Sequence, residues 1–350
     1  MSSKNIELIS IKEYVSVLKK VLPSYVFQTN KFQLIVIFLH SIGVISFIAL
    51  SVMTNNVFLK IIYSIVAGHS LGVIGLIGHE VLHGTVVKKR RWQYLVGGYC
   101  IFQFGLHPKM WKAWHNVEHH QSTQDPKTDP DCFGHVLIYK KSKVLRFLET
   151  IAPGSGKKRS FFFLFYWFSL HTIIVAFFDS KSFLDFRYRL ISQIYLIFIL
   201  ASWIFLTLFL GGFNAFVFAF LIPLSISNFL MMSYIATQHF LSPLTVTTND
   251  PLINSLTVRS PKWIERLHVN TGYHAVHHIF PSLNPKYAPI VNDAIKELWP
   301  GRIREMSHLK ALKQIYRTPR FYSKWNVLQN PRTGEKVQTL YSSMDNDPVS

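Results

Sequence analysis

Four long apolar runs dominate the hydrophobic pattern of this sequence. A helix that crosses a bilayer needs about 20 consecutive, mostly apolar residues. The runs that reach this length are residues 33–53, 57–78, 190–210 and 214–236. Short turns at 54–56 and 211–213 separate the members of each pair. The pattern therefore predicts an all-α integral membrane protein with four transmembrane helices in two hairpins.

Two other apolar segments are predicted to enter the membrane without crossing it. Residues 161–178 are nearly long enough for a fifth span, but basic residues lie before them, at 157–159, and after them, at 181–189. Lys and Arg concentrate on the cytoplasmic side of a membrane, so we expect both ends on that side and an interfacial or re-entrant segment. Residues 92–106 are shorter and contain Gly97-Gly98.

The more polar segments are predicted to lie on the cytoplasmic face. Residues 1–31 contain an amphipathic stretch, for which we expect a helix lying on the lipid headgroups. Residues 32–300 are expected to form the membrane-embedded domain and its helical cap, with a helix at 287–298. Residues 301–350 return to a polar composition and are predicted to be a cytoplasmic C-terminal segment. Both termini are then cytoplasmic.

The charge of the chain is a signal of sidedness. The sequence is 49% hydrophobic and 16% charged, with a net charge of +19, whereas soluble domains carry about 25% charged residues. A basic excess can indicate nucleic-acid binding, but the polar domain that such proteins have is missing, so no nucleic-acid partner is expected. Lys60 is the only Lys or Arg within a predicted span. The excess indicates a cytoplasmic face in contact with membrane lipids.

Histidine supplies the candidate chemistry. Eight of the 16 histidines fall in three clusters, which are His79 with His83, then His115 with His119 and His120, then His274 with His277 and His278. Residues three or four apart share one face of a helix. Each cluster is therefore expected to project as a set, with His120 beside His119, and each lies next to an apolar segment. The three sets can converge on one face of the membrane.

Counting the imidazoles indicates the kind of metal. Structural zinc takes four ligands and catalytic zinc about three, so eight imidazoles are too many for one zinc ion. Imidazole suits iron, and eight ligands divide between two ions with positions left for dioxygen. The alternative is a membrane zinc peptidase, because His79-Glu80-Val81-Leu82-His83 fits HExxH with Glu80 as general base. That alternative gives a role to only two of these histidines. A metal-storing membrane scaffold is a non-enzymatic possibility.

The order and spacing of the clusters resemble the histidine boxes of the membrane fatty acid desaturase family. The stretch from His115 to Asp131 resembles the second box of that family with its trailing Asp-Pro-Asp, and the resemblance covers roughly residues 33–300. It implies a non-haem di-iron centre ligated by the eight box histidines, with His239 as a further ligand. Some members have Asn four residues before that histidine, where this chain has Ile235. Gln238 and Asn270 are the candidates to substitute for it.

Acidic residues near the boxes are candidates for orienting the ligands. Metal-bound histidines usually donate their second ring N–H to a carboxylate or carbonyl. Glu80, Glu118, Asp129 and Asp131 are placed for this role, although they would also fit as solvated loop acids. We add Asn270 to this set. No catalytic residues are expected beyond the metal ligands.

The resemblance also implies a reaction. Such an enzyme uses two iron ions, O₂ and two external electrons to introduce a carbon–carbon double bond into a fatty acyl chain, carried by a lipid or by coenzyme A. Ferredoxin or cytochrome b5 is the kind of electron donor expected. We expect the acyl chain in an apolar tunnel between the spans and the cap. A di-iron hydroxylase and a carotenoid-modifying oxygenase share the boxes and remain alternatives.

Overall fold

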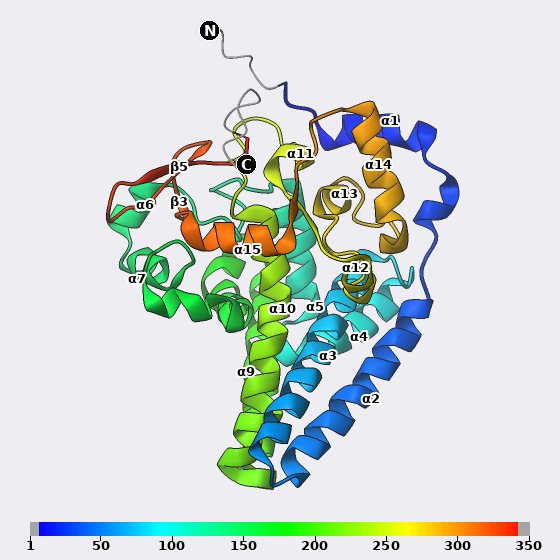
Figure 1. The fold of residues 1–350 in the computed structure, drawn as a ribbon, viewed down its shortest axis with the longest axis vertical. Helices are drawn as coiled ribbons and strands as arrows, with labels where there is room; N and C mark the ends of the chain where they lie inside the picture. Colours follow the sequence, from blue (N-terminus) through cyan, green and yellow to red (C-terminus); the bar gives the residue numbers. More distant parts are fainter. Residues whose placement is uncertain (1–6, 342–350) are drawn as a thin grey trace.

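Helices make up most of the chain in the computed structural model, which describes residues 7–341 (Figure 1). Four helical segments are long and apolar enough to cross a membrane, as predicted. They are α2 (Phe32–Met53), α3 (Val57–His83), Phe186–Phe209 within α9 (Phe186–Ala215), and Gly211–His239, which contains the π-helix η7 (Phe216–Leu221) and α10 (Ile222–His239).

Two turns at the same end of the molecule close the two hairpins (Figure 1). The first turn ends at Asn56, whose side chain accepts a hydrogen bond from the backbone of Leu59 and caps α3. The second is a kink at Gly212, whose backbone has φ 62° and ψ −161°. Glycine adopts such a conformation without steric cost. The kink lies where the sequence predicts the turn between the third and fourth spans.

Glycines bring α3 and α10 into close contact. A Cβ atom on Gly68 would lie 2.6 Å from the carbonyl oxygen of Pro223, and one on Gly72 would lie 2.7 Å from a methyl group of Leu230. Small residues are common where membrane helices approach closely, because packing and not hydrophobic burial holds such helices together. The contact places the cap-side ends of the two helices next to each other.

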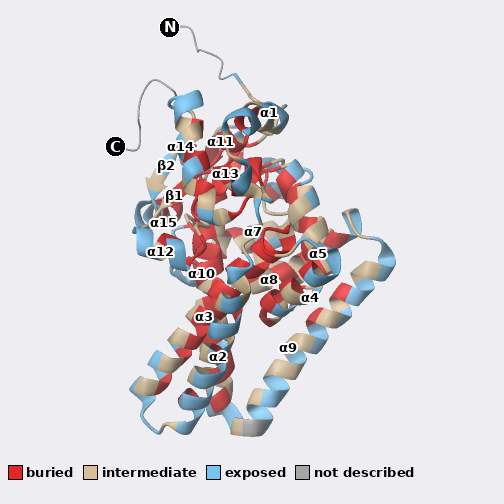
Figure 2. Cartoon of the chain, turned by 90° about the vertical axis from the view of Figure 1, so that its right-hand side faces the viewer, coloured by how far each residue is buried: buried red, intermediate tan, exposed pale blue. Residues whose placement is uncertain are grey.

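The outer helices α2 and α9 differ from this central pair in burial. The apolar windows of α3 and of Gly211–His239 are 67% and 50% buried, against 17% for α2 and 11% for the third span. Figure 2 shows the buried residues concentrated in the cap and in the adjoining halves of α3 and α10. Most exposed residues of α2 and α9 are apolar, as is expected for helices that face lipid.

The two segments predicted to enter without crossing have different shapes. Residues 158–182 form two helical pieces, Lys158–Phe165 and Trp167–Ser182, bent by 79° relative to each other. They comprise η4 (Lys158–Phe165), α8 (Trp167–Ile174), η5 (Val175–Asp179) and η6 (Ser180–Ser182). The re-entrant arrangement of this bent pair stays a prediction. The other segment holds α4 (Arg90–Ile101) and η2 (Phe102–Phe104), and at 1.5 Å per residue α4 reaches only about 18 Å.

The remaining elements form a cap at the end of the spans opposite the two turns (Figure 1). Before the bent pair the cap contains α5 (Pro108–Trp111), the π-helix η3 (Lys112–His119), α6 (Val136–Lys141) and α7 (Lys143–Ile151). After the spans it contains α11 (Pro251–Asn254), α12 (Lys262–Leu267), α13 (His274–Ile279), η8 (Pro285–Tyr287), α14 (Ala288–Leu298) and α15 (His308–Arg317). The helix predicted at 287–298 corresponds to α14.

Two small sheets correct the prediction of an all-α fold. Strands β1 (Thr257–Arg259) and β2 (Glu305–Ser307) pair in parallel, and β3 (Phe321–Lys324), β4 (Val327–Gln329) and β5 (Lys336–Gln338) form an antiparallel sheet. Each strand has only three or four residues. Such strands are too short to produce a period-two pattern that stands out from the surrounding loops.

The N-terminal helix is amphipathic as predicted, but its apolar face contacts protein. Helix α1 (Ile11–Val21), followed by η1 (Ser24–Phe27), buries Tyr14 and Leu18 against α13 and α14. The Tyr14 hydroxyl lies 3.1 Å from Asp250 and joins the helix to the cap. Figure 1 shows α1 at the end of the cap away from the spans. This corrects the expectation of a helix lying on headgroups. The predictions for the two termini fall on residues 1–6 and 342–350, outside the described residues.

Candidate metal centre

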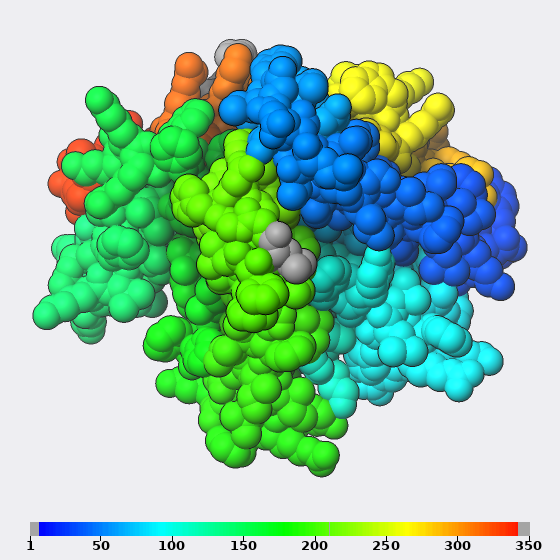
Figure 3. Space-filling model, turned by 90° about the horizontal axis from the view of Figure 1, so that it is seen from below, coloured from blue at the N-terminus to red at the C-terminus, as the bar shows by residue number. Residues whose placement is uncertain are grey.

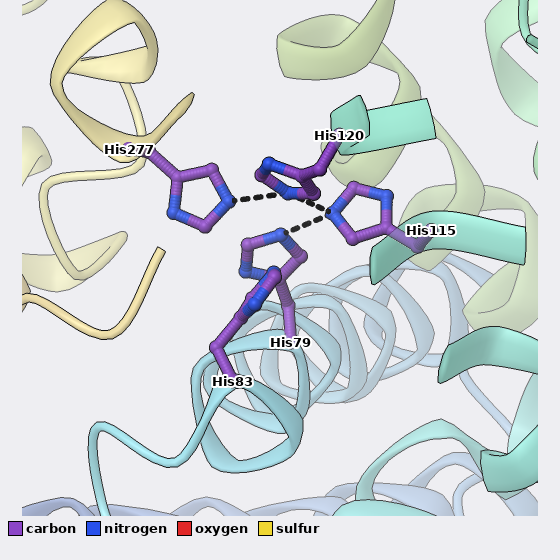
Figure 4. A group of neighbouring side chains, drawn as sticks. All are labelled: His79, His83, His115, His120 and His277. Atoms are coloured by element: carbon purple, nitrogen blue, oxygen red, sulfur yellow. Dashed lines mark hydrogen bonds between the residues drawn. The ribbon is translucent and has the colours of Figure 1, made fainter. Parts of the chain in front are cut away.

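Five histidines from all three boxes form the first of two groups. His79 and His83 come from the end of α3, His115 and His120 from η3 and the residue after it, and His277 from α13. One nitrogen from each lies within 4.8 Å of the corresponding nitrogens of the others. Figure 4 shows the rings converging on one point, with Nε2–Nε2 distances of 2.9 Å for His79–His115, 3.1 Å for His115–His120 and 3.2 Å for His120–His277.

Four buried histidines form the second group. His119 comes from η3, His239 from the last residue of α10, and His274 and His278 from α13. The Nε2 atom of His274 lies 2.6 Å from that of His239 and 2.9 Å from that of His278. His239, which the resemblance added to the eight box histidines, thus lies beside box three. The two groups together contain the nine histidines predicted as ligands.

Boxes two and three divide their histidines between the groups, which corrects the expectation that each box projects as a set. In box two His115 and His120, five residues apart, belong to the first group and His119 to the second. The reason is that η3 is a π-helix, in which residues five apart are aligned and which often occurs at functional sites. In box three His277 belongs to the first group, while His274 and His278, one helical turn apart, belong to the second.

In each group, one histidine has a carboxylate at Nδ1, the ring nitrogen that points away from the other imidazoles. In the first group, Nδ1 of His79 lies 3.0 Å from Glu80, which also accepts a hydrogen bond from the hydroxyl of Thr85. In the second group, Nδ1 of His119 lies 3.0 Å from Asp129 and 3.3 Å from Asp131. These contacts leave Nε2 of each ring facing the other imidazoles.

Two residues predicted to orient the ligands make no contact with them. The side chain of Glu118 is half-buried and has no hydrogen bond or ion pair within residues 7–341. The side-chain amide of Asn270 donates to the carbonyl of Pro285, at 2.9 Å. Gln238, considered as a substitute for the missing Asn, donates to the carbonyl of Thr271. Asn270 and Gln238 do line the cavity described below.

Three residues at the site were not singled out from the sequence. The Thr123 hydroxyl donates to the carbonyl of His119 and lies 3.2 Å from Nδ1 of His278, so it is placed to accept a hydrogen bond from that ring. The amide of Gln124 donates to the carbonyl of His239. His171, in α8, places its Nδ1 3.5 Å from Asp131. Thr123 and Gln124 follow box two closely, which was the available signal, whereas His171 has no sequence signal.

Burial and neighbouring charges set the pKa values of the cap histidines. Burial, together with the other histidines, lowers the pKa of five rings well below the ordinary value, in His115, His120, His274, His277 and His278. These rings are therefore neutral near pH 7, the form that binds metals. Burial also lowers the pKa of His119, but Asp129 and Asp131 outweigh burial and raise it to about 9.

A cavity of about 600 Å³ passes both groups. His79, His115 and His277 of the first group line it, as do His119, His239 and His274 of the second. Its other walls are mostly apolar, and they include Leu76, Trp167, Phe168, Met231, Phe280 and Leu283. Ligand cavities typically have this size, with mostly apolar walls and a few polar groups. This one places apolar walls and imidazole nitrogens within a single space.

Comparison with known protein families decides the relationship. Residues 56–310 match the fatty acid desaturase family, and the match includes all nine histidines. The chain belongs to the fatty acid desaturase family. Family membership, together with the four apolar helices, makes this desaturase-family chain a membrane protein and an oxidoreductase whose substrate class is fatty acyl. No curated protein matches the chain.

Proposed function

We propose that the protein is a membrane-bound fatty acyl desaturase that uses two iron ions, O₂ and two external electrons. The observation that carries the proposal is the pair of adjacent all-histidine groups on the wall of one apolar cavity. The reaction removes two hydrogen atoms from neighbouring methylene carbons. One O₂, two electrons and two protons are consumed with them, and two water molecules form. No side-chain acid or base can remove hydrogen from such a carbon.

The residues present fit two metal ions. Thr123 gives its proton to the carbonyl of His119, so Nδ1 of His278 must carry the proton that joins them, and Nε2 of that ring presents a lone pair to His274. In the first group Nε2 of His83 is buried and has no hydrogen-bond partner within residues 7–341. Nε2 of His274 faces both His239 and His278, and one hydrogen atom or one lone pair on it does not suit both, whereas a cation between the rings does. Imidazole is a suitable ligand for iron, and the described clusters offer no cysteine.

Each part of the site then has a distinct role. The nine histidines would hold the two ions, and Glu80, Asp129 and Asp131 would fix the rings they contact. When bound, the ions supply with O₂ the oxidising chemistry that amino-acid side chains lack. The apolar walls bind the acyl chain, with about 0.8 kcal/mol gained per buried methylene group. They also exclude water, so that the reacting carbons lie against the histidine face.

The sidedness of the protein follows from its charges. The turns at 54–56 and 210–214 contain no Lys or Arg, and Lys60 is the only basic residue near that end of the spans. By the positive-inside rule the cap, with the metal centre, is cytoplasmic. A small acidic electron carrier such as ferredoxin or cytochrome b5 would approach this basic face by electrostatic attraction. The re-entrant arrangement of 158–182 fits the same orientation, because both of its ends are basic.

Expression in a host of known lipid composition tests the proposal. The chain is produced together with a ferredoxin or a cytochrome b5 and the matching reductase, and the fatty acids are analysed by mass spectrometry. We expect new double bonds. His277→Ala should abolish them while the protein stays in the membrane, and the matched control His40→Ala should not, because His40 lies in α2 and belongs to neither group.

Other outcomes separate the alternatives. A hydroxylated product would assign the chain to the hydroxylases of this ligand type. An unchanged fatty acid profile from iron-loaded protein, in a host that holds both carriers, would contradict the proposal. A zinc peptidase would instead lose activity in Glu80→Gln and keep it in His277→Ala.

A further inference from the structure

The cavity reaches the surface on one side. Exposed residues among those that line it are Lys127, Thr128, Ile138, Val144, Phe178 and Ser182, which together we call the mouth. The lining residues from α10 and from 269–288 are all buried or half-buried. The cavity therefore extends from the mouth, between α6–α7 and η5–η6, past the histidine groups to Leu283 and Ala288.

The mouth has large apolar side chains beside its polar residues Lys127, Thr128 and Ser182, whereas a water-facing entrance would be polar throughout. Ile138, Val144 and Phe178 are 47%, 64% and 65% exposed. Further exposed apolar side chains surround them, namely Leu137, Phe147, Phe161, Phe162 and Phe177. An exposed apolar area of this kind is typical of a surface that contacts a membrane or another protein.

A basic collar surrounds the same surface. Seven exposed Lys and Arg residues form it, and they are Lys140, Lys141, Lys143, Arg146, Lys157, Lys158 and Arg159. Glu149 is the only acidic residue between 136 and 160, and it is paired with Arg332 at 2.9 Å. Basic residues beside exposed apolar ones are typical of helices that lie in an anionic membrane interface, with long Lys and Arg side chains reaching the headgroups.

The mouth also lies at the level of the membrane surface. One of its walls is the bent pair Lys158–Phe165 and Trp167–Ser182, which together are apolar enough for a membrane segment. Figure 1 shows α7 at the lower edge of the cap, next to the place where α10 leaves it. In the view from the turn end of the spans, the green segments that include α7 lie beside the spans and project sideways from them (Figure 3).

We propose that this mouth opens sideways into the cytoplasmic leaflet, and that the substrate is an acyl chain still attached to a membrane lipid. The acyl chain enters from the leaflet while its headgroup stays among the basic side chains of the collar. The proposal rests on the proposed function for the reaction itself, but binding through the mouth needs neither iron nor turnover. A coenzyme A ester, which approaches from water, has no use for exposed Ile138, Val144 and Phe178 at the entrance.

Photo-crosslinking distinguishes the two carriers without any reaction. The full chain is reconstituted in vesicles of phosphatidylcholine and phosphatidylglycerol. One preparation contains a phosphatidylcholine with a diazirine near the end of one acyl chain, and the other receives an acyl-coenzyme A with the same diazirine. After illumination, adducts are located by peptide mass spectrometry. We expect the lipid probe to label cavity residues around Phe280 and Leu283.

A matched pair of variants tests the route of entry. Ile138 and Leu137 are neighbours in α6 and both are exposed, but only Ile138 lines the cavity. Ile138→Trp should lower lipid labelling inside the cavity about tenfold, a penalty of about 1.4 kcal/mol, and Leu137→Trp should leave it unchanged. Val144→Trp provides a second obstruction should Ile138→Trp fail to fold.

The results of the crosslinking experiment can be told apart from those that test the proposed function. Labelling of the cavity by acyl-coenzyme A alone, labelling by the lipid on the outer surface alone, or no adduct with either probe would each overturn the lipid-entry proposal. A chain that desaturates only coenzyme A esters would overturn it as well and keep the proposed function. A chain labelled inside by the lipid that makes no double bond would keep lipid entry and lose the function.

Discussion

The two histidine groups differ in burial and in how firmly their rings are held. In the first group His120 is buried and the other four histidines are half-buried, and one carboxylate, that of Glu80, forms a hydrogen bond to a ring. Every histidine of the second group is buried, and two of its rings are held from outside, His119 by Asp129 and Asp131 and His278 by Thr123. One group thus has five imidazoles and few supports, and the other has four imidazoles and several.

This difference suggests unequal roles for two ions. Groups that hold the outer nitrogens of metal-bound histidines fix ring orientation and make the ring more basic, and their loss typically costs 10–100-fold in metal affinity. The second group is built to hold an ion rigidly. The first group is more accessible, and its ion should be the one that a chelator removes first.

Removing one ligand from each group should have the largest effect. His115→Ala takes a ring from the centre of the first group, and His274→Ala takes one from the second. Each should lower double-bond formation by at least about a hundredfold, because loss of a ligand costs more than loss of a neighbour that orients it. Elemental analysis should find one iron in place of two. If either variant kept two ions and full activity, the division into groups would be wrong.

Substituting the carboxylates that contact the histidines should have the next largest effect, and the effect should differ between the two groups. Asp129→Asn should lower iron affinity by about a hundredfold. The loss is large because Asp129 also accepts hydrogen bonds from the backbone N–H groups of Gln124 and Asp131. Glu80→Gln should lower iron affinity by only about tenfold, since within residues 7–341 the hydrogen bonds of the Glu80 carboxylate are limited to His79 and Thr85. Competition with a chelator measures both. Equal losses would show that the additional supports do not matter.

The spans could be predicted from the sequence because hydropathy over about 20 residues depends on composition alone. The structure adds residues to all four runs, and those that it adds at the end of α3 include His79 and His83. These polar residues lie beyond the apolar run, so the pattern stops before the helix does. The small sheets gave no signal, and the protein partner of α1 depends on tertiary contacts with α13 and α14 that no local pattern encodes.

The site was predictable as a set of residues but not as an arrangement. Spacing of three and four residues identified the boxes, yet the division of box two depends on the π-helical turn of η3, which aligns His115 with His120. Contacts of Asp129 and Asp131 with His119 require the loop after box two to fold back. His171 is brought to Asp131 by the bent apolar segment.

Loss of the Thr123 hydroxyl should have a smaller effect, confined to the second group. Thr123→Val removes the acceptor for Nδ1 of His278, so that the ring loses its outer hydrogen bond. We expect iron affinity to fall by about threefold to tenfold, below the range for a lost carboxylate. Thr247→Val is the matched control, since Thr247 is exposed and its side chain has no hydrogen bond within residues 7–341. A larger loss from Thr247→Val would place the effect elsewhere than at His278.

A pair of histidines outside both groups provides the smallest effect and the sharpest contrast. Nε2 of His69 lies 3.1 Å from Nε2 of His268, as close as the rings of the two groups, but only two imidazoles meet there and Nδ1 of His268 lies 2.9 Å from the Tyr234 hydroxyl. One ring can donate to the other, so this pair needs no ion, and His69→Gln should leave the iron content unchanged.

The pair should instead affect stability at low pH. Burial, with His69 and His308, lowers the pKa of His268 to about 4. Below about pH 6.5 the unfolded chain binds a proton at His268 and the folded protein does not. The free energy of unfolding therefore falls as the pH drops from about 6.5 toward 4. Between pH 7 and pH 5 the melting temperature of the wild type should fall by about 2–4 °C more than that of His268→Gln. Thermal unfolding in detergent measures the difference, and equal falls would show that His268 is protonated in the folded protein.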